Sequence, residues 1–458
     1  MFKKLMGDRM FYKQILALAI PIMIQNGITN FVNMLDNVMV GKVGTLQMTG
    51  VAVSNQLIFV FNLCIFGAIS GAGIFGAQFF GKSDVEGIRH TFRFKIIFCS
   101  ILCVLGILLF FFCGEGLIGL YLNEGSKQSI SASLGFGKSY LNLMLIGLIP
   151  YTIAQCYSST LRETGKAVPP MVAGIIAIIV NLTLNYILIF GKFGAPRLGV
   201  NGAAIATVIS RFAELLILVI YTAHRKKENP FITGAFKSLY IPLSLVKSII
   251  IKGLPLMFNE TMWAAGMATL NQCYSVRGID VVAANNICQT FFNLFSVAFL
   301  AVGVAIGILL GQILGTGDIE KAKDYSFKLI AFSVFVSIIF AVIYIFAANY
   351  IPQIYNTEAS IRLTAARLMQ ISAIAMPVDS FAHAAYFILR SGGKTAITLI
   401  FDSGFMWVIS VPLAFVLSRF TSLSILPLFA IIQAINLIKC VLGYAFVKKG
   451  EWLKTIVN

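Results

Sequence analysis

Long apolar stretches recur throughout this chain of 458 residues, and they constrain its fold more than any other feature. A helix that spans a membrane needs about 20 consecutive, mostly apolar residues. A membrane β-barrel would instead alternate apolar and polar residues in segments of about 10 residues. Twelve stretches fit the helical requirement, at 14–36, 51–79, 94–113, 136–158, 168–190, 200–222, 249–273, 283–313, 328–349, 364–389, 396–417 and 424–447. The sequence therefore predicts an all-α membrane protein with twelve transmembrane helices.

Composition agrees with a chain that has the lipid bilayer as a partner. Hydrophobic residues make up 58% of the sequence and charged residues only 12%, whereas soluble domains contain about 25% charged residues. The net charge of +17 comes from bases in short loops between apolar runs, and no basic surface with interleaved aromatic residues is apparent, so we expect no nucleic-acid partner. The eight cysteines form no C-x-x-C pair, so we expect neither disulfides nor a structural metal.

The basic residues also predict an orientation. If the loops alternate between the two sides of the membrane, 24 Lys and Arg lie on the side of both termini and 9 lie on the opposite side. Cytoplasmic loops carry the excess of Lys and Arg in membrane proteins. We therefore expect both termini in the cytoplasm.

The two halves of the chain are related by a repeat. At a shift of 234 residues, G-A-Q-F-F-G-K-S-D-V-E (76–86) aligns with L-G-Q-I-L-G-T-G-D-I-E (310–320), and at a shift of 228, L-R-E-T-G-K (161–166) aligns with L-R-S-G-G-K (389–394). Six spans in each half give both repeats the same orientation. We expect two pseudo-symmetric six-helix bundles around a central cavity, an arrangement that suits alternating access in a transporter. The predicted domains are an N-terminal lobe (1–222), a cytoplasmic linker (223–248) and a C-terminal lobe (249–458).

Five acidic residues fall inside the predicted spans, where each charge costs about 2.5–3.5 kcal/mol at the bilayer centre. In the first half, Asp36 shares one helical face with Gln25, Thr29 and Asn33. This polar face should contact protein or water rather than lipid. Asp36 is a candidate cation or proton site, and polar packing between helices is the alternative. Glu214 lies three residues after Arg211, a spacing that allows an ion pair within one helix.

In the second half, Glu260 follows Pro255 and Asp379 follows Pro377. Two carboxylates beside proline kinks could bind Na⁺ or share a proton. His383, one turn beyond Asp379, is either a proton relay or a packed histidine. Asp402 is open to a functional or a structural role, with the bases of the preceding loop, Arg390 and Lys394, as the expected counter-charges.

Several motifs resemble the MATE (multidrug and toxic compound extrusion) family of antiporters along nearly the whole chain. In the first half they are A-I-P with Asp36 and M-V-G-K, G-A-Q-F-F-G-K-S-D, L-R-E-T-G-K, N-L-T-L-N-Y-I-L-I-F-G (181–191) and P-R-L-G-V-N-G-A-A-I-A-T (196–207). In the second half they are G-L-P with Glu260, G-Q-I-L-G-T-G-D and M-P-V-D (376–379).

The resemblance implies two six-helix bundles in a V shape and export of cationic, often aromatic drugs in exchange for Na⁺ or H⁺. It implies a monomeric protein of the bacterial cytoplasmic membrane with no cofactor besides the coupling ion. By position, Glu260 and Asp379 resemble the second-lobe ion site of the sodium-coupled branch, which favours Na⁺. The residues that resemble the first-lobe ion site are Asp36, Asn181, Asn185, Ala203 and Thr207; some relatives carry Asp at the position of Asn185.

Three other functions compete with that of a drug exporter. A flippase for lipid-linked saccharides should gather Arg or Lys inside its spans to hold pyrophosphate, whereas away from the span ends this chain has only Arg211 and Lys439. A membrane-embedded enzyme would need a nucleophile–base pair or a metal motif such as H-E-x-x-H, and the three histidines are far apart. A channel stays an alternative, although a repeat with kinked acidic helices suits a carrier better.

Overall fold

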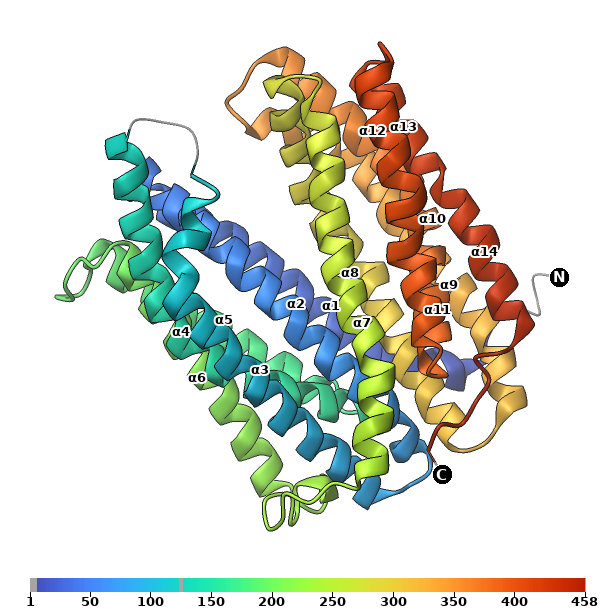
Figure 1. The fold of residues 1–458 in the computed structure, drawn as a ribbon. Helices are drawn as coiled ribbons and strands as arrows, with labels where there is room; N and C mark the ends of the chain where they lie inside the picture. Colours follow the sequence, from blue (N-terminus) through green and yellow to red (C-terminus); the bar gives the residue numbers. More distant parts are fainter. Residues whose placement is uncertain (1–5, 123–126, 458) are drawn as a thin grey trace. The chain divides into compact units, whose positions relative to one another are not determined.

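The computed structural model describes residues 6–122 and 127–457, apart from the side chains of Asn33, Met34, Asn37 and Val38. Throughout these residues the regular structure is helical, and no strand occurs in the described ranges. Figure 1 shows the helices coloured along the chain. The all-α fold predicted from the apolar stretches is confirmed.

Ten long helices come first in the chain, and irregular segments complete the fold. The long helices are α1 (Arg9–Gly41), α2 (Thr45–Gly81), α3 (Val85–Gly119), α4 (Lys127–Glu163), α5 (Val168–Phe190), α6 (Val200–His224), α7 (Leu243–Ser275), α8 (Ile279–Gly315), α9 (Ile319–Ala347) and α10 (Ala359–Ser391). Short 3₁₀ turns η2 (Pro230–Ile232) and η3 (Ile351–Ile354) lie in connections. Among the described residues, eleven helices are long and apolar enough to cross a membrane. The predicted span that falls outside this set is α7, which carries Lys247, Lys252 and Glu260.

The last two spans are continuous but irregular helices, which the apolar pattern did not reveal. The predicted span 396–417 consists of α11 (Thr395–Leu399), two π-helical segments η4 (Ile400–Gly404) and η5 (Met406–Ser410), and α12 (Val411–Phe420). The predicted span 424–447 has an irregular turn at Ile435, between α13 (Ile425–Ala434) and α14 (Asn436–Lys449). π-Helical turns are rare and frequently occur at functional sites.

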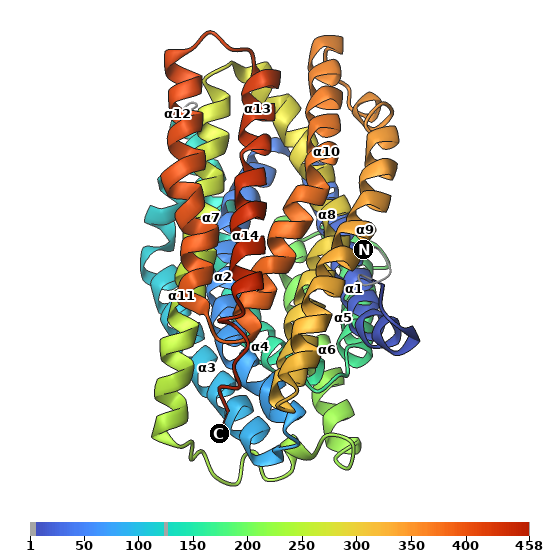
Figure 2. The same cartoon turned by 90° about the vertical axis from the view of Figure 1, so that its right-hand side faces the viewer.

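The described helices divide into two compact units. The N-terminal unit contains Ile24–Gly76 and Asp84–Ile249, and the C-terminal unit contains the start of the chain up to Met23, the segment Ala77–Ser83, and the chain from Ile250 onward. In the N-terminal unit, α4 packs against α3 and α6, and α6 also packs against α5. In the C-terminal unit, α10 packs against α8, α9, α13 and α14 (Figure 2). The lobe boundaries predicted from the sequence stay a prediction.

The repeated motif forms a close crossing between the end of α2 and the end of α8, both within the C-terminal unit. A Cβ atom on Gly81 would overlap the backbone carbonyl oxygen of Gln312, and a Cβ atom on Gly315 would overlap that of Gln78. The repeat aligns Gly81 with Gly315 and Gln78 with Gln312, so the two contacts are equivalent under the 234-residue shift. Small residues allow membrane helices to approach this closely, so the matched glycines have a packing reason.

The acidic end of the same motif caps the helix that follows. Asp84 accepts a hydrogen bond of 2.9 Å from the backbone N–H of Gly87 at the start of α3. Asp318, its counterpart in the repeat, accepts one of 3.0 Å from Lys321 at the start of α9. Such caps satisfy backbone donors that a helix leaves unpaired in its first turn. They also explain why α3 begins before the apolar run at 94.

A buried ion pair joins α3 to α4. The Lys95 ammonium donates to both carboxylate oxygens of Glu163 at 2.6 Å and to Thr160 at 3.1 Å. The two charged side chains are 0% and 5% exposed. Gly76 of α2 lies against the carboxylate, and a Cβ atom there would overlap Glu163. Lys95 is thus a core residue and not one of the loop bases.

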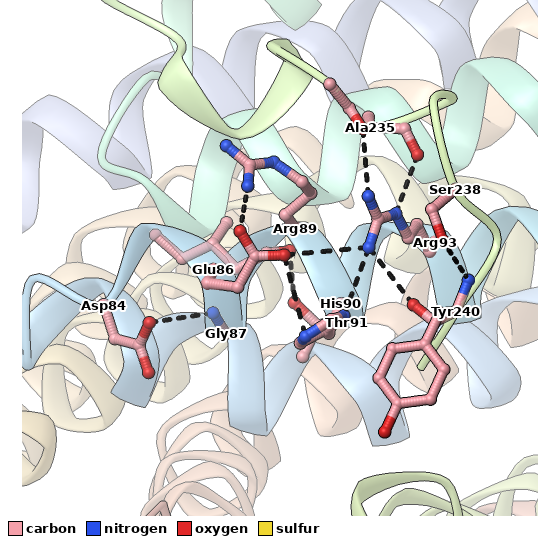
Figure 3. Close-up of polar contacts among 12 residues, drawn as sticks. Asp84, Glu86, Gly87, Arg89, His90, Thr91, Arg93, Ala235, Ser238 and Tyr240 are labelled. Carbon is pink, nitrogen blue, oxygen red and sulfur yellow. Dashed lines mark hydrogen bonds and ion pairs between the residues drawn. The ribbon is translucent and has the colours of Figure 1, made fainter. Parts of the chain in front are cut away.

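The segment between α6 and α7 is held on the start of α3. Arg93 donates to the carbonyl oxygens of Ala235 (2.7 Å), Gly234 (2.9 Å) and Tyr240 (3.1 Å), as Figure 3 shows. Glu86 lies 3.7 Å from Arg93 and also faces Arg89 and His90. One arginine therefore supplies donors to three carbonyl groups of a segment that has little regular structure of its own.

The C-terminal segment that follows α14 packs into the C-terminal unit. Trp452 is fully buried, and a Cβ atom on Gly392 would overlap its carbonyl oxygen. Gln78 donates to the carbonyl oxygens of Ser391 (3.0 Å) and Lys454 (3.2 Å). Hydrogen bonds from Lys449 and Lys394 lower the pKa of Glu451. This segment thus ties the end of α2 to the end of α10.

Replacing Gly81 with Ala should destabilise the protein, because the new methyl group overlaps the Gln312 carbonyl. Overpacking of this kind costs about 1–3 kcal/mol. The matched control is Gly116→Ala in α3, where a Cβ atom meets nothing within 4 Å and a small gain in helix stability is expected. The melting temperature of each purified variant is measured by heating samples and using size-exclusion chromatography to detect the loss of folded protein. Equal melting temperatures for the two variants would contradict the crossing.

Replacing Glu163 with Gln should destabilise the N-terminal unit by about 3–5 kcal/mol, because it leaves the buried Lys95 ammonium without its counter-charge. The double variant Lys95→Met/Glu163→Met removes both charges and should recover much of the loss. The same thermal assay, together with the folded yield, gives the comparison. A double variant no more stable than the single one would argue against a charge-pairing role.

Candidate functional site

The five residues predicted for the first-lobe ion site lie together in the N-terminal unit. The Asn185 amide donates to Asp36 Oδ1 at 2.7 Å and to Asn181 Oδ1 at 3.0 Å. Asn181 in turn donates to Thr207 Oγ1 at 3.2 Å, and Thr207 donates to the Ala203 carbonyl at 3.0 Å. A single chain of hydrogen bonds therefore connects α1, α5 and α6.

Helical spacing explains how these side chains meet. Asn181 and Asn185 are four residues apart on α5, and Ala203 and Thr207 are four residues apart on α6, so each pair lies on one face of its helix. The helices α5 and α6 pack against each other. The Asn185 Oδ1 atom is buried and accepts no hydrogen bond from the described residues. An unpaired buried carbonyl oxygen beside a carboxylate offers oxygen ligands of the kind that hard cations prefer.

The polar face of α1 is turned toward protein, as the sequence predicted. Gln25 is buried, lies against Gly174 of α5, and accepts a hydrogen bond of 2.6 Å from Arg162. Thr29 donates to the Gln25 carbonyl at 2.8 Å. The side chain of Asn33 lies outside the described residues. Asp36 is thus the acidic end of a face that the neighbouring helices cover in part.

The predicted Arg211–Glu214 pair is present in α6. The guanidinium and carboxylate are 3.6 Å apart, and the Glu214 side chain is 5% exposed. The Arg211 guanidinium also lies 4.7 Å from the centre of the Tyr151 ring, which favours a cation. Glu214 therefore has a structural partner on its own helix.

Glu260 and Asp379, the predicted second-lobe acids, are held by different neighbours. Asn436, the first residue of α14, donates to Asp379 Oδ1 at 3.0 Å. The Tyr386 hydroxyl lies 3.5 Å from Glu260 Oε1 as its donor. Asp379 and Tyr386 are seven residues apart on α10 and share one face. The two acids thus border the same face of α10, although no direct contact between them occurs among the described interactions.

His383 lies on this face of α10 but is packed among aromatic rings. Its ring centre lies 5.0 Å from that of Phe387, 6.0 Å from that of Phe299, and 6.2 Å from that of Tyr386, on which it stacks. Gly303 of α8 leaves room for the imidazole, because a Cβ atom there would overlap it. These contacts are those of a packed histidine, and the relay role stays a prediction.

Asp402 has a different counter-charge from the one expected. Lys439 of α14 forms an ion pair with Asp402 Oδ1, and Asn259 of α7 donates to Asp402 Oδ2 at 3.0 Å. Lys394, one of the two expected partners, faces Glu451 instead, at 3.4 Å. The π-helical backbone of η4 places Asp402 beside α14, a position that a regular helix pattern does not predict.

Asn259 organises the surroundings of this pair, and sequence reasoning missed it. Its amide also lies 3.4 Å from the Tyr386 hydroxyl, the group that reaches Glu260. Its oxygen accepts hydrogen bonds from the Ser403 hydroxyl (2.8 Å) and backbone N–H (3.3 Å). A signal exists in the sequence, because Asn259 is an amide inside a predicted span and directly precedes Glu260.

The side chains of the described ranges do not favour a transition-metal site. Among them, no group of three or more His, Cys, Asp and Glu residues could hold a metal ion. Around Asp36, Glu260 and Asp379, the described hydrogen-bond donors are amide and hydroxyl groups.

Comparison with known proteins identifies the family. The MatE family model matches residues 21–187 and 255–416, which is more than half of the chain. The Thermotoga maritima protein named "Probable multidrug resistance protein NorM" is 26% identical over 453 residues, covering 97% of this chain and 94% of that protein. The Pectobacterium atrosepticum protein named "Multidrug resistance protein MdtK" is 26% identical over 412 residues, covering 89% and 87%.

Solved structures share the fold. A MOP superfamily transporter from Pyrococcus furiosus superposes with a TM-score of 0.87 at 19% identity, covering 99% of this chain and 98% of that one. A mutant of the Vibrio cholerae MATE transporter VcmN superposes with a TM-score of 0.86 at 17% identity, covering 97% and 98%. The predicted family resemblance is confirmed: this chain is a multi-pass membrane transporter rather than an enzyme, and it belongs to the MatE family.

Proposed function

We propose that this protein is a multidrug efflux antiporter, which exports cationic, often aromatic small molecules in exchange for an inward cation. The observation that carries the proposal is the hydrogen-bonded chain from Asp36 through Asn185 and Asn181 to Thr207 inside a membrane helix bundle. The names of its relatives, multidrug resistance proteins NorM and MdtK, support the substrate class.

In this proposal Asp36 binds the coupling cation in the first lobe. The unpaired Asn185 Oδ1 supplies a second oxygen, and Asn181, Thr207 and the Ala203 carbonyl complete the polar surroundings. A bound cation would satisfy the buried amide oxygen that otherwise has no donor among the described residues, which offsets part of the cost of removing the ion from water.

In the second lobe, Glu260 and Asp379 form the other cation site. Each carboxylate has a neutral donor, Tyr386 and Asn436 respectively, so each keeps lone pairs for an ion. Oxygen ligands without sulfur or clustered histidine suit Na⁺, and we favour Na⁺ over H⁺ as the coupling ion. His383 would take part only if the ion is a proton.

Exchange follows from competition between cations for these acids. An ion or drug shifts the conformational equilibrium only by as much as its affinities for the two access states differ. Cation entry from outside favours drug release there, and cation release inside returns the carrier to its drug-accepting state. The protein would act as a monomer in the cytoplasmic membrane of a bacterium, with both termini in the cytoplasm.

The contacts of Arg211 and Lys439 favour a drug exporter over a saccharide flippase. These are the two bases that the sequence places inside spans, and each is paired with an acid, Glu214 and Asp402 respectively. A pyrophosphate group would have to displace a carboxylate to reach either of them. Asp36, Glu260 and Asp379 have no lysine or arginine as a described hydrogen-bond donor, so their carboxylates suit a cationic substrate.

Proteoliposomes loaded with ethidium should lose the dye faster when a Na⁺ gradient is imposed at clamped pH. A pH gradient in Na⁺-free buffer should have a smaller effect, because Glu260 and Asp379 are proposed to prefer Na⁺. Fluorescence of the released dye measures both arms. A response to the pH gradient alone would assign H⁺, and no response to either would overturn the antiporter.

Asp379→Asn and Asp36→Asn should each reduce gradient-driven efflux by about tenfold or more, a factor within the usual range of coupling energies between sites. Each change removes a carboxylate charge but keeps the size of the side chain. The matched control is Asp324→Asn, which alters an exposed ion pair with Lys328 on α9 and should leave efflux unchanged. Full activity of the Asp379 variant would remove the second-lobe site from the mechanism.

A further inference from the structure

The last two spans, which are irregular helices, bring a lysine to an acid inside the C-terminal unit. Lys439, on α14 just after the irregular turn at Ile435, pairs with Asp402 in the π-helical segment η4. The side chains are 14% and 20% exposed. The ammonium also lies 5.5 Å from the centre of the Phe401 ring. π-Helical turns such as η4 frequently occur at functional sites.

The same face of α14 also contacts Asp379 of α10. Asn436, which donates to Asp379 Oδ1, is three residues before Lys439 and so lies on one helical face with it. The next residue, Cys440, donates from its thiol to the Val378 carbonyl at 3.3 Å, which fixes α14 against α10 beside Asp379. One turn of α14 therefore contacts both acids, through an amide at Asp379 and an ammonium at Asp402.

Stability alone is a poor explanation for this pair. A buried ion pair can often be replaced by apolar residues of similar volume without loss of stability, because desolvation offsets much of the attraction. Both oxygens of Asp402 are nevertheless occupied, one by Lys439 and the other by Asn259. The described hydrogen bonds to Glu260 and Asp379 come from neutral groups, a phenol and an amide, while the charges of Arg390 and Lys439 lie nearby.

We propose that Lys439 is a tethered counter-cation that occupies Asp402 and restricts the exchangeable cation site of the second lobe to Glu260 and Asp379. Lys439 is a positioning residue in this role, since it acts on the coupling ion through Asp402. The inference deepens the proposed antiport and rests on it for the identity of the coupling ion. It adds a residue that sets how many cations the lobe binds.

Lys439→Gln should create one more cation site, because the Asp402 carboxylate loses its internal partner. Equilibrium dialysis of the purified full-length protein with radioactive sodium counts bound Na⁺. Potentiometric titration of the same samples counts a bound proton. We expect one additional cation per protein relative to wild type, as Na⁺ or as a proton. The matched control is Lys328→Gln, the same change in the exposed pair with Asp324, which should add none.

Asp402→Asn should have the opposite effect, because it frees the Lys439 ammonium to compete for Asp379 one turn away. The apparent affinity for Na⁺ should fall by about tenfold or more, as expected when a fixed cation competes for the same carboxylate. The double variant Asp402→Asn/Lys439→Gln removes both charges. It should return the number of bound cations and the Na⁺ affinity to wild-type values.

The proposal is overturned if Lys439→Gln binds no additional cation, or if Asp402→Asn and the double variant have equal Na⁺ affinity. A purely structural pair would lower the folded yield of both single variants without changing ion binding in the folded fraction. If Lys439→Gln does not fold, the comparison of Asp402→Asn with the double variant decides. Binding is measured without drug, so failure of ethidium efflux in the wild type would count against the antiporter and not against this pair.

Discussion

A charged side chain inside a membrane must find its counter-charge or its hydrogen-bond donors within the protein, and this requirement organises both units. Glu163 is neutralised by Lys95 in a fully packed site. Asp402 is neutralised by Lys439. Asp36 and Asp379 instead receive hydrogen bonds from amides. The surroundings of the acids differ accordingly, because an ion pair neutralises a carboxylate whereas a neutral amide leaves it with its charge and with free lone pairs.

Patterns within one helix, or between the two repeats, could be predicted from the sequence. The first-lobe residues were predicted from the family resemblance, and their steps of four on α5 and α6 explain why each pair lies on one helical face. The matched motif at 76–86 and 310–320 predicted related halves, and the crossing of Gly81 with Gln312 and of Gly315 with Gln78 gives that match its packing reason. The proposed substrate class came from the family resemblance and could not be predicted from composition and spacing.

Pairs that depend on tertiary packing could not be predicted in this way. Lys95 and Glu163 are separated by 68 residues, and Lys439 and Asp402 by 37. Lys95 also lies at the edge of an apolar run, where a loop and a buried helix turn have the same composition. The π-helical turns at Asp402 and the irregular turn at Ile435 are changes in backbone hydrogen bonding, to which an average of hydropathy is insensitive. These two irregularities place Asn436 and Lys439 at their acids.

The crossing of α2 and α8 has a further consequence for how such a chain could arise. Residue 81 meets residue 312 while residue 78 meets residue 315, and the repeat equates 78 with 312 and 81 with 315. The ends of α2 and α8 therefore contact each other through equivalent residues, which is the arrangement of an isologous interface in a twofold homodimer. Two copies of a single six-helix chain inserted in the same orientation could make this contact before any gene fusion. Within this single chain, the matched glycines make the contact between the two repeats locally twofold, as in a symmetric dimer.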